Sequence, residues 1–509
     1  MPTPYATPVL QVVAPALVGV AVAVAAASAA GDRDRPASAD VRVLIGERPV
    51  SRPLRGGFVG VSLEMPALLS YAGRDPNTVN PVFEQLLRNL APGQEPVVRL
   101  GGDSADASWV PAPGVRRPRG VSYTITRRWL RTARRLAQDL GARMIVGVDL
   151  QAGSRALAAA QGGAFVSAIG GRYLRALEIG NEANRYPALP YYRVAPHHPV
   201  FARSRGYDFA SFAREFATVA PTMPAVPLAG PTVGGLGWLR HLRGFLAAEP
   251  RVGVATFHRY PLNRCFTEPD SSTYPTIARL LSSRASRGLV EGLDGYVALA
   301  HRHGVAFRVD EMNSVACGGK RGVSDTFASA LWALDTLFSM AQAGVDGVNV
   351  HTFPGAAYQL FGFRHVGGRW VATVRPEYYG LMMFAQAAPP GSRLVSIRVS
   401  KNPGVRAWAT IGTAGRLRVV LINDDPTHGH VVAFKPPSAR PAAATVEYLR
   451  ARSVTATSGL TLGGRSFGAS TSTGTLAGAA RTTRISPSDG TYTVTLPAAG
   501  AALVTVPRS

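Results

Sequence analysis

The sequence predicts an α/β protein in which a (β/α)8 TIM barrel is followed by an all-β sandwich domain. Three observations predict this fold class. Through the first three-quarters of the chain, eight short apolar runs each end in polar or glycine-containing residues, as buried parallel strands do. Helix-like segments separate these runs. Around residue 390 the pattern changes to alternating apolar and polar residues between turn signals, which is typical of antiparallel sheets.

The eight predicted strands alternate with helices in the order that a closed barrel requires. The strands are expected at residues 56–64, 96–104, 143–150, 176–182, 226–232, 252–260, 305–313 and 345–353. The helical segments include residues 81–92, 127–142, 208–220, 293–304 and 324–344. The run "VPLAGPT" at 226–232 is the weakest of the eight. A doubly wound open sheet is the structural alternative, but it more often carries a glycine-rich phosphate turn after its first strand, and this sequence shows none.

These patterns divide the chain into four segments. Residues 1–30 form a hydrophobic segment, residues 31–54 a linker with a strand, residues 55–388 the catalytic barrel and residues 389–509 the β-sandwich. The linker strand, "VRVLIG", precedes the first barrel strand and is a candidate to pair with the C-terminal sheet.

The N-terminal segment resembles a signal peptide. An apolar run rich in alanine and valine extends from Val12 to Ala30, and the small residues "ASAA" precede Gly31. Residues 1–15 contain no Lys or Arg, which departs from the usual signal peptide and makes an uncleaved membrane anchor the alternative. We expect a secreted protein without stable membrane insertion unless this segment remains uncleaved.

The net charge of +24 suggests a polyanion partner, but the distribution of basic residues argues against nucleic acid. Only Lys320, Lys401 and Lys435 are lysines among 55 basic residues, so the excess resembles an arginine-rich coding bias. The arginines are scattered and lack interleaved aromatic residues. We therefore expect no nucleic-acid binding.

Two cysteines, Cys265 and Cys317, exclude a disulfide scaffold and a four-thiolate metal site. No cluster has metal-ligand spacing, and the pair at 197–198, two histidines in a predicted loop, is typical of a surface. We expect neither a metal nor another cofactor.

Two carboxylates stand where a barrel places its catalytic groups. Glu182, preceded by Asn181, follows the fourth predicted strand, and Glu311 ends the seventh. Both therefore rise from the carboxyl-terminal rim and face each other across the barrel mouth. Hydrolysis of a glycosidic bond with retention needs such a pair, one acting as acid and then base and the other as nucleophile. Mutual repulsion and partial burial are expected to keep one of them protonated.

The motifs around these residues resemble glycoside hydrolase family 79 of clan A, which includes microbial β-glucuronidases and the heparanases. The most specific is "FRVDEMNSVACGGKRGVSDTFASALWALDTL" at 307–337. Further matching motifs lie at 56–69, 97–106, 177–186, 257–265, 406–424 and 454–464. The resemblance covers most of the chain from about residue 40 onward.

The resemblance implies a role for each matching residue. Glu182 is the expected general acid/base, Glu311 the nucleophile, and Asn181 the partner of the sugar 2-hydroxyl. Tyr260, with His258 nearby, is expected to hold Glu311 ionised; packing at the rim is the alternative for both.

The remaining implied contacts concern recognition of the sugar. Gly318 and Gly319 are expected to offer backbone N–H groups, and Tyr358 its hydroxyl, to a uronate carboxylate; a simple turn is the alternative for the glycines. Glu64 is expected to contact a hydroxyl. Asp103 stands where an amide or hydroxyl is more usual, a departure from the family pattern. A disulfide between the two cysteines, which follow neighbouring barrel strands, is plausible in an exported protein, and two free thiols are the alternative.

We therefore expect a retaining β-glucuronidase that removes terminal β-linked glucuronic acid from a carbohydrate. The alternatives are an endo-acting, heparanase-like enzyme, a different β-glycosidase on the same scaffold, and a catalytically silent glycan-binding protein. Retention of both Glu182 and Glu311 argues against the silent protein, since a binder needs neither an acid nor a nucleophile.

Overall fold

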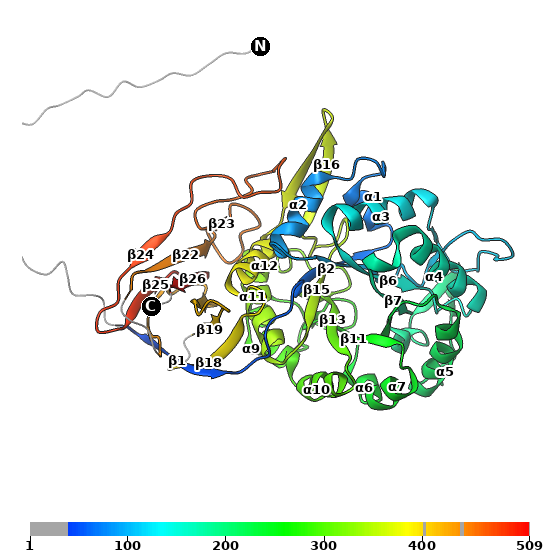
Figure 1. Cartoon of the computed structure of the whole chain (residues 1–509), viewed down its shortest axis with the longest axis horizontal. Helices are drawn as coiled ribbons and strands as arrows, with labels where there is room; N and C mark the ends of the chain where they lie inside the picture. Colours follow the sequence, from blue (N-terminus) through cyan, green and yellow to red (C-terminus); the bar gives the residue numbers. More distant parts are fainter. Residues whose placement is uncertain (1–38, 401–403, 438–441, 508–509) are drawn as a thin grey trace, which may run out of the picture. The chain divides into compact units, whose positions relative to one another are not determined.

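In the computed structural model, which describes residues 39–400, 404–437 and 442–507, eight parallel strands close into a barrel (Figure 1). In barrel order they are β2 (Val59–Glu64), β3 (Val97–Gly101), β6 (Arg143–Val148), β7 (Leu174–Ile179), β10 (Leu228–Val233), β11 (Val252–Arg259), β13 (Ala306–Met312) and β15 (Gly347–His351). Each predicted barrel strand is thereby confirmed, including the weak run "VPLAGPT", which forms β10. The strands are almost wholly buried, because the barrel interior covers one face and the helices cover the other.

Helices surround the barrel. They are α1 (Ala67–Ala72), α2 (Pro81–Leu90), α3 (Arg127–Leu140), α4 (Arg155–Ile169), α5 (Phe209–Val219), α6 (Leu236–Leu239), α7 (Leu242–Ala248), α8 (Ile277–Leu280), α9 (Ser283–Ser286), α10 (Asp294–Arg302), α11 (Phe327–Gln342) and α12 (Pro376–Ala387). The five helical segments predicted from the sequence correspond to α2, α3, α5, α10 and α11. Side-chain caps begin several of them; Asn80 accepts hydrogen bonds from the second and third residues of α2.

Four short strand pairs form within the described loops. They are β4 (Ser108–Trp109) with β5 (Tyr123–Thr124), β8 (Pro190–Ala195) with β9 (His198–Phe201), β12 (Leu262–Asn263) with β14 (Val315–Ala316), and β16 (Phe361–Val366) with β17 (Arg369–Val374). The pair of histidines at 197–198 lies at the exposed turn of the β8–β9 hairpin. The β12–β14 pair joins the loops that follow β11 and β13, and this pairing shapes the mouth of the barrel.

The C-terminal part forms a mostly antiparallel sheet domain. Its strands are β18 (Arg393–Val399), β19 (Val405–Ile411), β20 (Leu417–Asn423), β21 (His430–Lys435), β22 (Ala444–Arg450), β23 (Thr461–Leu462), β24 (Thr483–Ile485), β25 (Tyr492–Leu496) and β26 (Gly500–Val506). β1 (Val41–Pro49), the strand before the barrel, pairs antiparallel with β18 and parallel with β21. β25 ends the hydrogen-bonded path, yet it contacts β20 and β26, so the sheet folds over one apolar core.

The sheet domain packs against α11 and α12 of the barrel (Figure 1). Asp335 of α11 accepts hydrogen bonds from Trp408 Nε1, at 2.7 Å, and from the Ser286 hydroxyl. The first turn of α11 has no side-chain cap; instead the Phe327 and Ala328 N–H groups donate to the carbonyls of residues 456 and 454 of the sheet domain, at 2.8 and 3.0 Å. The sheet domain thus satisfies backbone groups that a helix start leaves unpaired.

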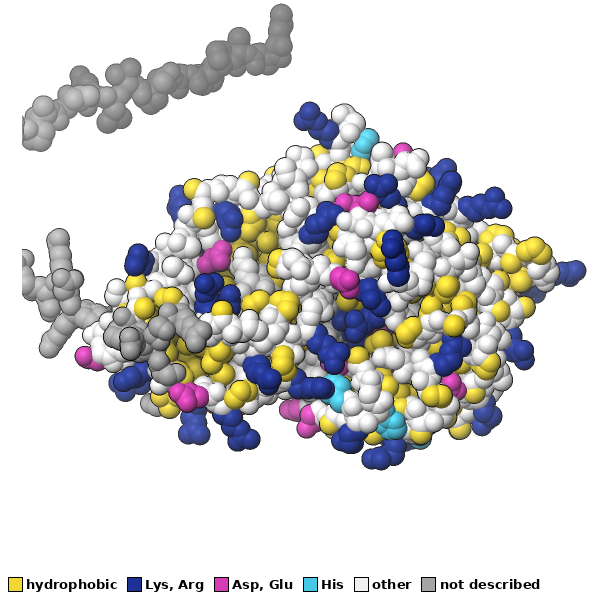
Figure 2. Space-filling model, in the orientation of Figure 1, with side chains coloured by type: hydrophobic (Ala, Val, Ile, Leu, Met, Phe, Trp, Pro, Cys, Tyr) yellow, Lys and Arg dark blue, Asp and Glu magenta, His cyan; other side chains and the backbone are white. Residues whose placement is uncertain are grey.

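The predicted signal peptide at 1–30 lies outside the described residues. Within the described part of the chain, no helix has the length and apolar character needed to cross a bilayer. Lys and Arg side chains are spread over the visible face and outnumber Asp and Glu there (Figure 2).

Candidate active site

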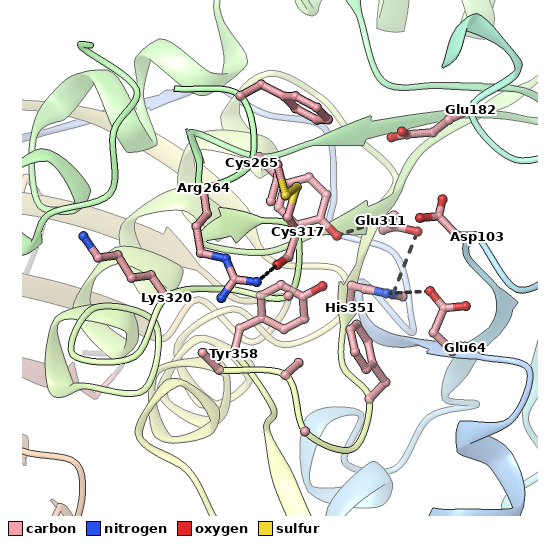
Figure 3. Close-up of a pocket in the computed structure, with 18 of the residues that line it drawn as sticks. Glu64, Asp103, Glu182, Arg264, Cys265, Glu311, Cys317, Lys320, His351 and Tyr358 are labelled. Atoms are coloured by element: carbon pink, nitrogen blue, oxygen red, sulfur yellow. Dashed lines mark hydrogen bonds and ion pairs between the residues drawn. A yellow bond between two sulfur atoms is a disulfide. The ribbon is translucent and has the colours of Figure 1, made fainter. Parts of the chain in front are cut away.

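A cavity of about 810 Å3 opens at the carboxyl ends of the barrel strands. In Figure 3, Glu64, Asp103, Glu182 and Glu311 lie toward one side of it, and Arg264 and Lys320 toward the other. The acidic groups come from the strand ends, and Arg264 and Lys320 come from the loops after β11 and β13. A further cation, Arg185, follows β7 and pairs with Glu182 on the acidic side. The cavity is lined only by barrel residues up to Tyr358. Its volume can therefore hold a ligand larger than one sugar.

Glu182 and Glu311 meet at the centre of this mouth, with His258 beside them. One oxygen of each carboxylate and one nitrogen of His258 all lie within 4.8 Å of one another. His258 Nδ1 is 3.1 Å from Glu182 Oε1 and 3.9 Å from Glu311 Oε2. The same three side chains are the group that could hold a metal ion in the described part of the chain.

Glu311 is surrounded by groups that favour its ionised form. Tyr260 donates a 2.8 Å hydrogen bond to Oε1, and Arg99 Nη1 lies 2.7 Å from Oε2. Burial by itself would raise the pKa of Glu311, but His351, His258, Arg99 and the Tyr260 hydroxyl together hold this pKa well below its usual range. Glu311 is therefore a carboxylate over the whole neutral range, as a nucleophile must be.

The pKa of Glu182 differs from the expected one. Repulsion by Glu311 was expected to keep one carboxyl group protonated, but the pKa of Glu182 is also lowered. Burial and Glu311 both raise it; the hydrogen bond and charge of His258, together with Arg185 at 2.8 Å, outweigh them. Glu182 also has a left-handed backbone, with φ 46° and ψ 49°, which is costly for a non-glycine residue. The strand exit is thus bent to aim this side chain into the cavity.

Asn181 is held in one orientation. Its Oδ1 accepts a 2.9 Å hydrogen bond from Arg99 Nη2, which leaves Nδ2 to donate to Asp103 at 3.0 Å. Its backbone N–H donates to Asp106 at 2.9 Å. Nδ2 carries a second proton. Asn181 is buried, and it lines a smaller cavity of about 190 Å3 that shares Asp103 and Glu182 with the main one.

The pKa of Asp103 bears on its departure from the family pattern. Its side chain is accessible from the cavity, yet the depth of the site and the neighbouring carboxylates Glu64, Glu182 and Glu311 raise its pKa to about 8. Asp103 is therefore mainly a neutral acid at pH 7, with a hydroxyl proton to donate. A protonated carboxyl group can donate a hydrogen bond, as a hydroxyl or amide group can.

Glu64 is fixed at the end of β2. It accepts hydrogen bonds from the Ser104 N–H, at 2.9 Å, and from the Ser104 hydroxyl, and it lies 3.4 Å from His351 Nε2. Its remaining acceptor capacity faces the cavity.

The loop after β13 differs from expectation in one detail. Gly318 lines the cavity, and its φ of 81° is one that favours glycine. The Gly319 N–H, however, donates to the Val315 carbonyl at 3.1 Å, so it serves the turn and is not directed at a ligand. Tyr358 is buried beside this loop and lines the cavity.

Cys265 and Cys317 form a disulfide, with their Cα atoms 6.2 Å apart. The bond joins the loops that follow β11 and β13 at the cavity rim, as Figure 3 shows. Arg264 Nη2 adds a 2.9 Å hydrogen bond to the Cys317 carbonyl. These links fix the wall that faces the acidic groups.

The sequence did not predict a place in the site for four residues: Arg99, Glu178, Asp310 and His351. Arg99 is fully buried and lies 2.7 Å from Glu178 and 3.3 Å from Asp310, besides its contacts with Glu311 and Asn181. A sequence signal was present, because Arg99, Glu178 and Asp310 each place a charge inside a buried barrel strand. A charge inside a buried strand needs a partner, and the site is where those partners meet.

The comparisons with known proteins agree with this geometry. The model of the glycosyl hydrolase family 79 C-terminal beta domain matches residues 407–503. A β-glucuronidase of Neurospora crassa is 24% identical over 454 residues, which are 78% of each chain. The crystal structure of a 4-O-α-L-rhamnosyl-β-D-glucuronidase from Fusarium oxysporum 12S superposes with a TM-score of 0.70 at 20% identity, covering 91% of this chain and 100% of that one.

More distant structures share the fold. A family 51 arabinofuranosidase from Xanthomonas axonopodis pv. citri has a TM-score of 0.63 at 13% identity, over 92% of this chain and 100% of that one. Barrel, sheet domain and paired carboxylates together define the class of the protein as a glycosidase. Within that class, the resemblance to glycoside hydrolase family 79 is confirmed.

Proposed function

We propose that this protein is a secreted, retaining β-glucuronidase, in which Glu311 is the nucleophile and Glu182 the acid/base. The observation that carries the proposal is the approach of the two carboxylates to within 4.8 Å, with His258 in contact with both. Retaining glycosidases hold their two carboxyl groups about 5–5.5 Å apart, whereas inverting ones keep about 6.5–9.5 Å to admit a water molecule, so the close approach favours direct attack by Glu311.

In the first step, Glu311 attacks the anomeric carbon while Glu182 gives its proton to the departing oxygen. Glu182 must therefore gain a proton when the substrate binds. A bound sugar displaces water from the cavity, and the loss of water favours the neutral form of a carboxyl group. The negative charge of Glu311 acts in the same direction.

In the second step, Glu182 takes a proton from a water molecule as its oxygen attacks the anomeric carbon, and the ester bond breaks to release Glu311 as a carboxylate. The charge of Glu311 has been consumed in the ester bond, so its upward effect on the pKa of Glu182 disappears. His258 and Arg185 remain and lower that pKa. The geometry therefore supports an acid in the first step and a base in the second, which is the change that double displacement needs.

The wall opposite the acids supports an anionic sugar. Arg264, Lys320 and Arg321 line it, together with Gly318 and Tyr358. Only one of the two predicted glycine N–H groups remains free for a carboxylate, because that of Gly319 is used within the turn. The positive wall compensates for this loss, and a charge-assisted hydrogen bond from a cation is stronger than one from a neutral donor.

The test compares a chromogenic β-glucuronide with the matching β-glucoside, using the wild type, Glu311→Gln and Glu182→Gln. We expect a strong preference for the glucuronide, and loss of turnover in Glu311→Gln. Glu182→Gln should keep activity toward a substrate with a good leaving group far better than toward one with a poor leaving group, because only the poor one needs the acid. NMR of the first product reports the anomer and thereby tests retention.

Each result separates the alternatives. Equal or greater turnover of the glucoside would reject the uronate specificity and keep a β-glycosidase. Cleavage of polymeric glucuronans without release of a terminal sugar would indicate the endo-acting, heparanase-like enzyme. Binding of glucuronides without any turnover in the wild type would indicate the silent glycan-binding protein.

A further inference from the structure

A second cavity, of about 350 Å3, lies at the opposite end of the barrel, where the strands begin. Arg143 is the first residue of β6 and Arg175 the second of β7. Arg52 and Arg55 come from the segment between β1 and β2, and His301 from α10. The rest of the lining is small or apolar: Pro227, Gly253, Val254, Gly304, Val305 and Ala306. Four arginines and a histidine therefore surround a cavity whose lining contains no Asp or Glu.

These guanidinium groups are poorly compensated. Among the ion pairs of the described residues, Arg55 has one, to Asp346 at 2.9 Å, whereas Arg143 and Arg175 have none. Asp346 is already engaged, because its other oxygen lies 2.7 Å from His301 Nε2 and accepts a 2.8 Å hydrogen bond from the Phe307 N–H. The nearest acid thus serves the rim of the cavity and leaves its centre positive.

Two of the arginines, both half-buried, each have one buried nitrogen without a partner. The Nε atoms of Arg143 and Arg175 are inaccessible to solvent and have no hydrogen-bond acceptor in the described structure. Burial lowers the pKa of Arg175, and the charge of Arg143 lowers it further. Buried donors without acceptors are rare and costly in native proteins. Two such donors beside one cavity, on side chains that repel each other, indicate that an acceptor with negative charge belongs between them.

We propose that this cavity is a binding site for a small ligand bearing a phosphate or sulfate group. Guanidinium forks match tetrahedral oxyanions, because two N–H groups of one fork can reach two oxygens. A divalent oxyanion offers enough charge and oxygens to pair Arg143 and Arg175 together, with Arg52 closing the open side. The cavity has the size of a small-molecule site and exceeds a bare anion, so the oxyanion is a group of a larger molecule. This site is independent of the proposed glycosidase activity.

The test measures binding, without reference to catalysis. Thermal unfolding of the wild type is followed while inorganic phosphate, inorganic sulfate, glucose 6-phosphate or glucose 6-sulfate replaces chloride at constant ionic strength. A ligand that binds only the folded protein raises Tm in a saturable way. We expect this rise with the oxyanions, and a dissociation constant at least tenfold higher, by calorimetry, for Arg143→Gln/Arg175→Gln. The matched control is Arg127→Gln/Arg131→Gln, which removes two exposed arginines of α3 and should bind as the wild type does.

The outcomes are distinct. Tighter binding of the sugar esters than of the inorganic ions supports a ligand-borne group, and equal binding supports a free oxyanion. Without ligand, the Arg143→Gln/Arg175→Gln variant should be no less stable than the wild type, since repulsion is removed. A linear, unsaturable response, or the same dissociation constant in both double variants, overturns the proposal. Should the inner variant fail to fold, Arg52→Gln, an exposed change at the same cavity, must weaken binding or the proposal is wrong.

Discussion

Replacing Tyr260 by phenylalanine tests how the protein keeps Glu311, the proposed nucleophile, ionised. The substitution removes the 2.8 Å hydrogen bond to Glu311 Oε1 and retains the ring, whose centroid lies 6.3 Å from that of Tyr358. A hydrogen bond to a charged group contributes about 1.5–3 kcal/mol. One pKa unit corresponds to about 1.4 kcal/mol, so the pKa of Glu311 should rise by roughly 1–2 units.

The rise should not neutralise Glu311 at neutral pH. The starting pKa lies well below the usual range, and Arg99, His351 and His258 remain in place. The acid limb of the kcat/KM profile, which reports the free enzyme, should therefore move to higher pH by roughly 1–2 units. The rate at pH 7 should fall because the nucleophile is less firmly positioned and its departure as a carboxylate is less favoured.

The assay is hydrolysis of a chromogenic β-glucuronide from about pH 2 to pH 8, a range that the acid limb of the variant should enter while that of the wild type lies below it. The matched control is Tyr207→Phe, because Tyr207 donates a hydrogen bond of the same 2.8 Å length to Glu215, outside the cavity. The control should leave the acid limb unmoved. An acid limb that stays in place in a folded Tyr260→Phe protein would refute the account of how Glu311 is kept ionised.

Three further predictions concern other parts of the molecule. Asp103→Asn should abolish a decline in kcat/KM above about pH 8 and raise Tm at pH 7–9. Folding raises the pKa of Asp103 to about 8, so the free energy of unfolding of the wild type falls as pH rises from the unfolded-state pKa toward 8. An unchanged alkaline limb in the pH profile would contradict this prediction. Asp335→Ala should lower the free energy of unfolding by about 3 kcal/mol, because two hydrogen bonds to a buried carboxylate are lost, while denaturant titration of an Asp335→Asn control shows a smaller loss. Cys265→Ser/Cys317→Ser should lower the free energy of unfolding by about 4 kcal/mol at most, the chain-entropy value for a cross-link spanning 52 residues; a Tm equal to that of the wild type would count against it.

The barrel could be predicted because its signals are local. A buried parallel strand is a short apolar run, and its carboxyl end is marked by polar residues such as Asn181 and Glu182. Even "VPLAGPT", with two prolines, forms a strand, because neighbouring strands on both sides supply the pairing that its own residues favour weakly.

The electrostatics of the site could not be predicted in this way. Arg99 reaches Glu311 across 212 positions of sequence, and the pairing of His258 with Glu182 spans 76. The contact with His258, together with Arg185, outweighs burial and lowers the pKa of Glu182, where repulsion between the two acids alone predicted the reverse. Side chains that meet only after the barrel closes leave no periodic pattern in the sequence.

The contacts at the start of α11 limit where the protein can be truncated. The acceptors for the Phe327 and Ala328 N–H groups belong to residues 456 and 454, and α11 begins where the loop carrying Gly318 ends. A shortened gene that stops after α12 would encode a barrel with an uncapped, uncovered helix next to its nucleophile loop. The barrel therefore should not be transferred without the sheet domain, and fusions or chimeras of this enzyme should be joined outside residues 41–506.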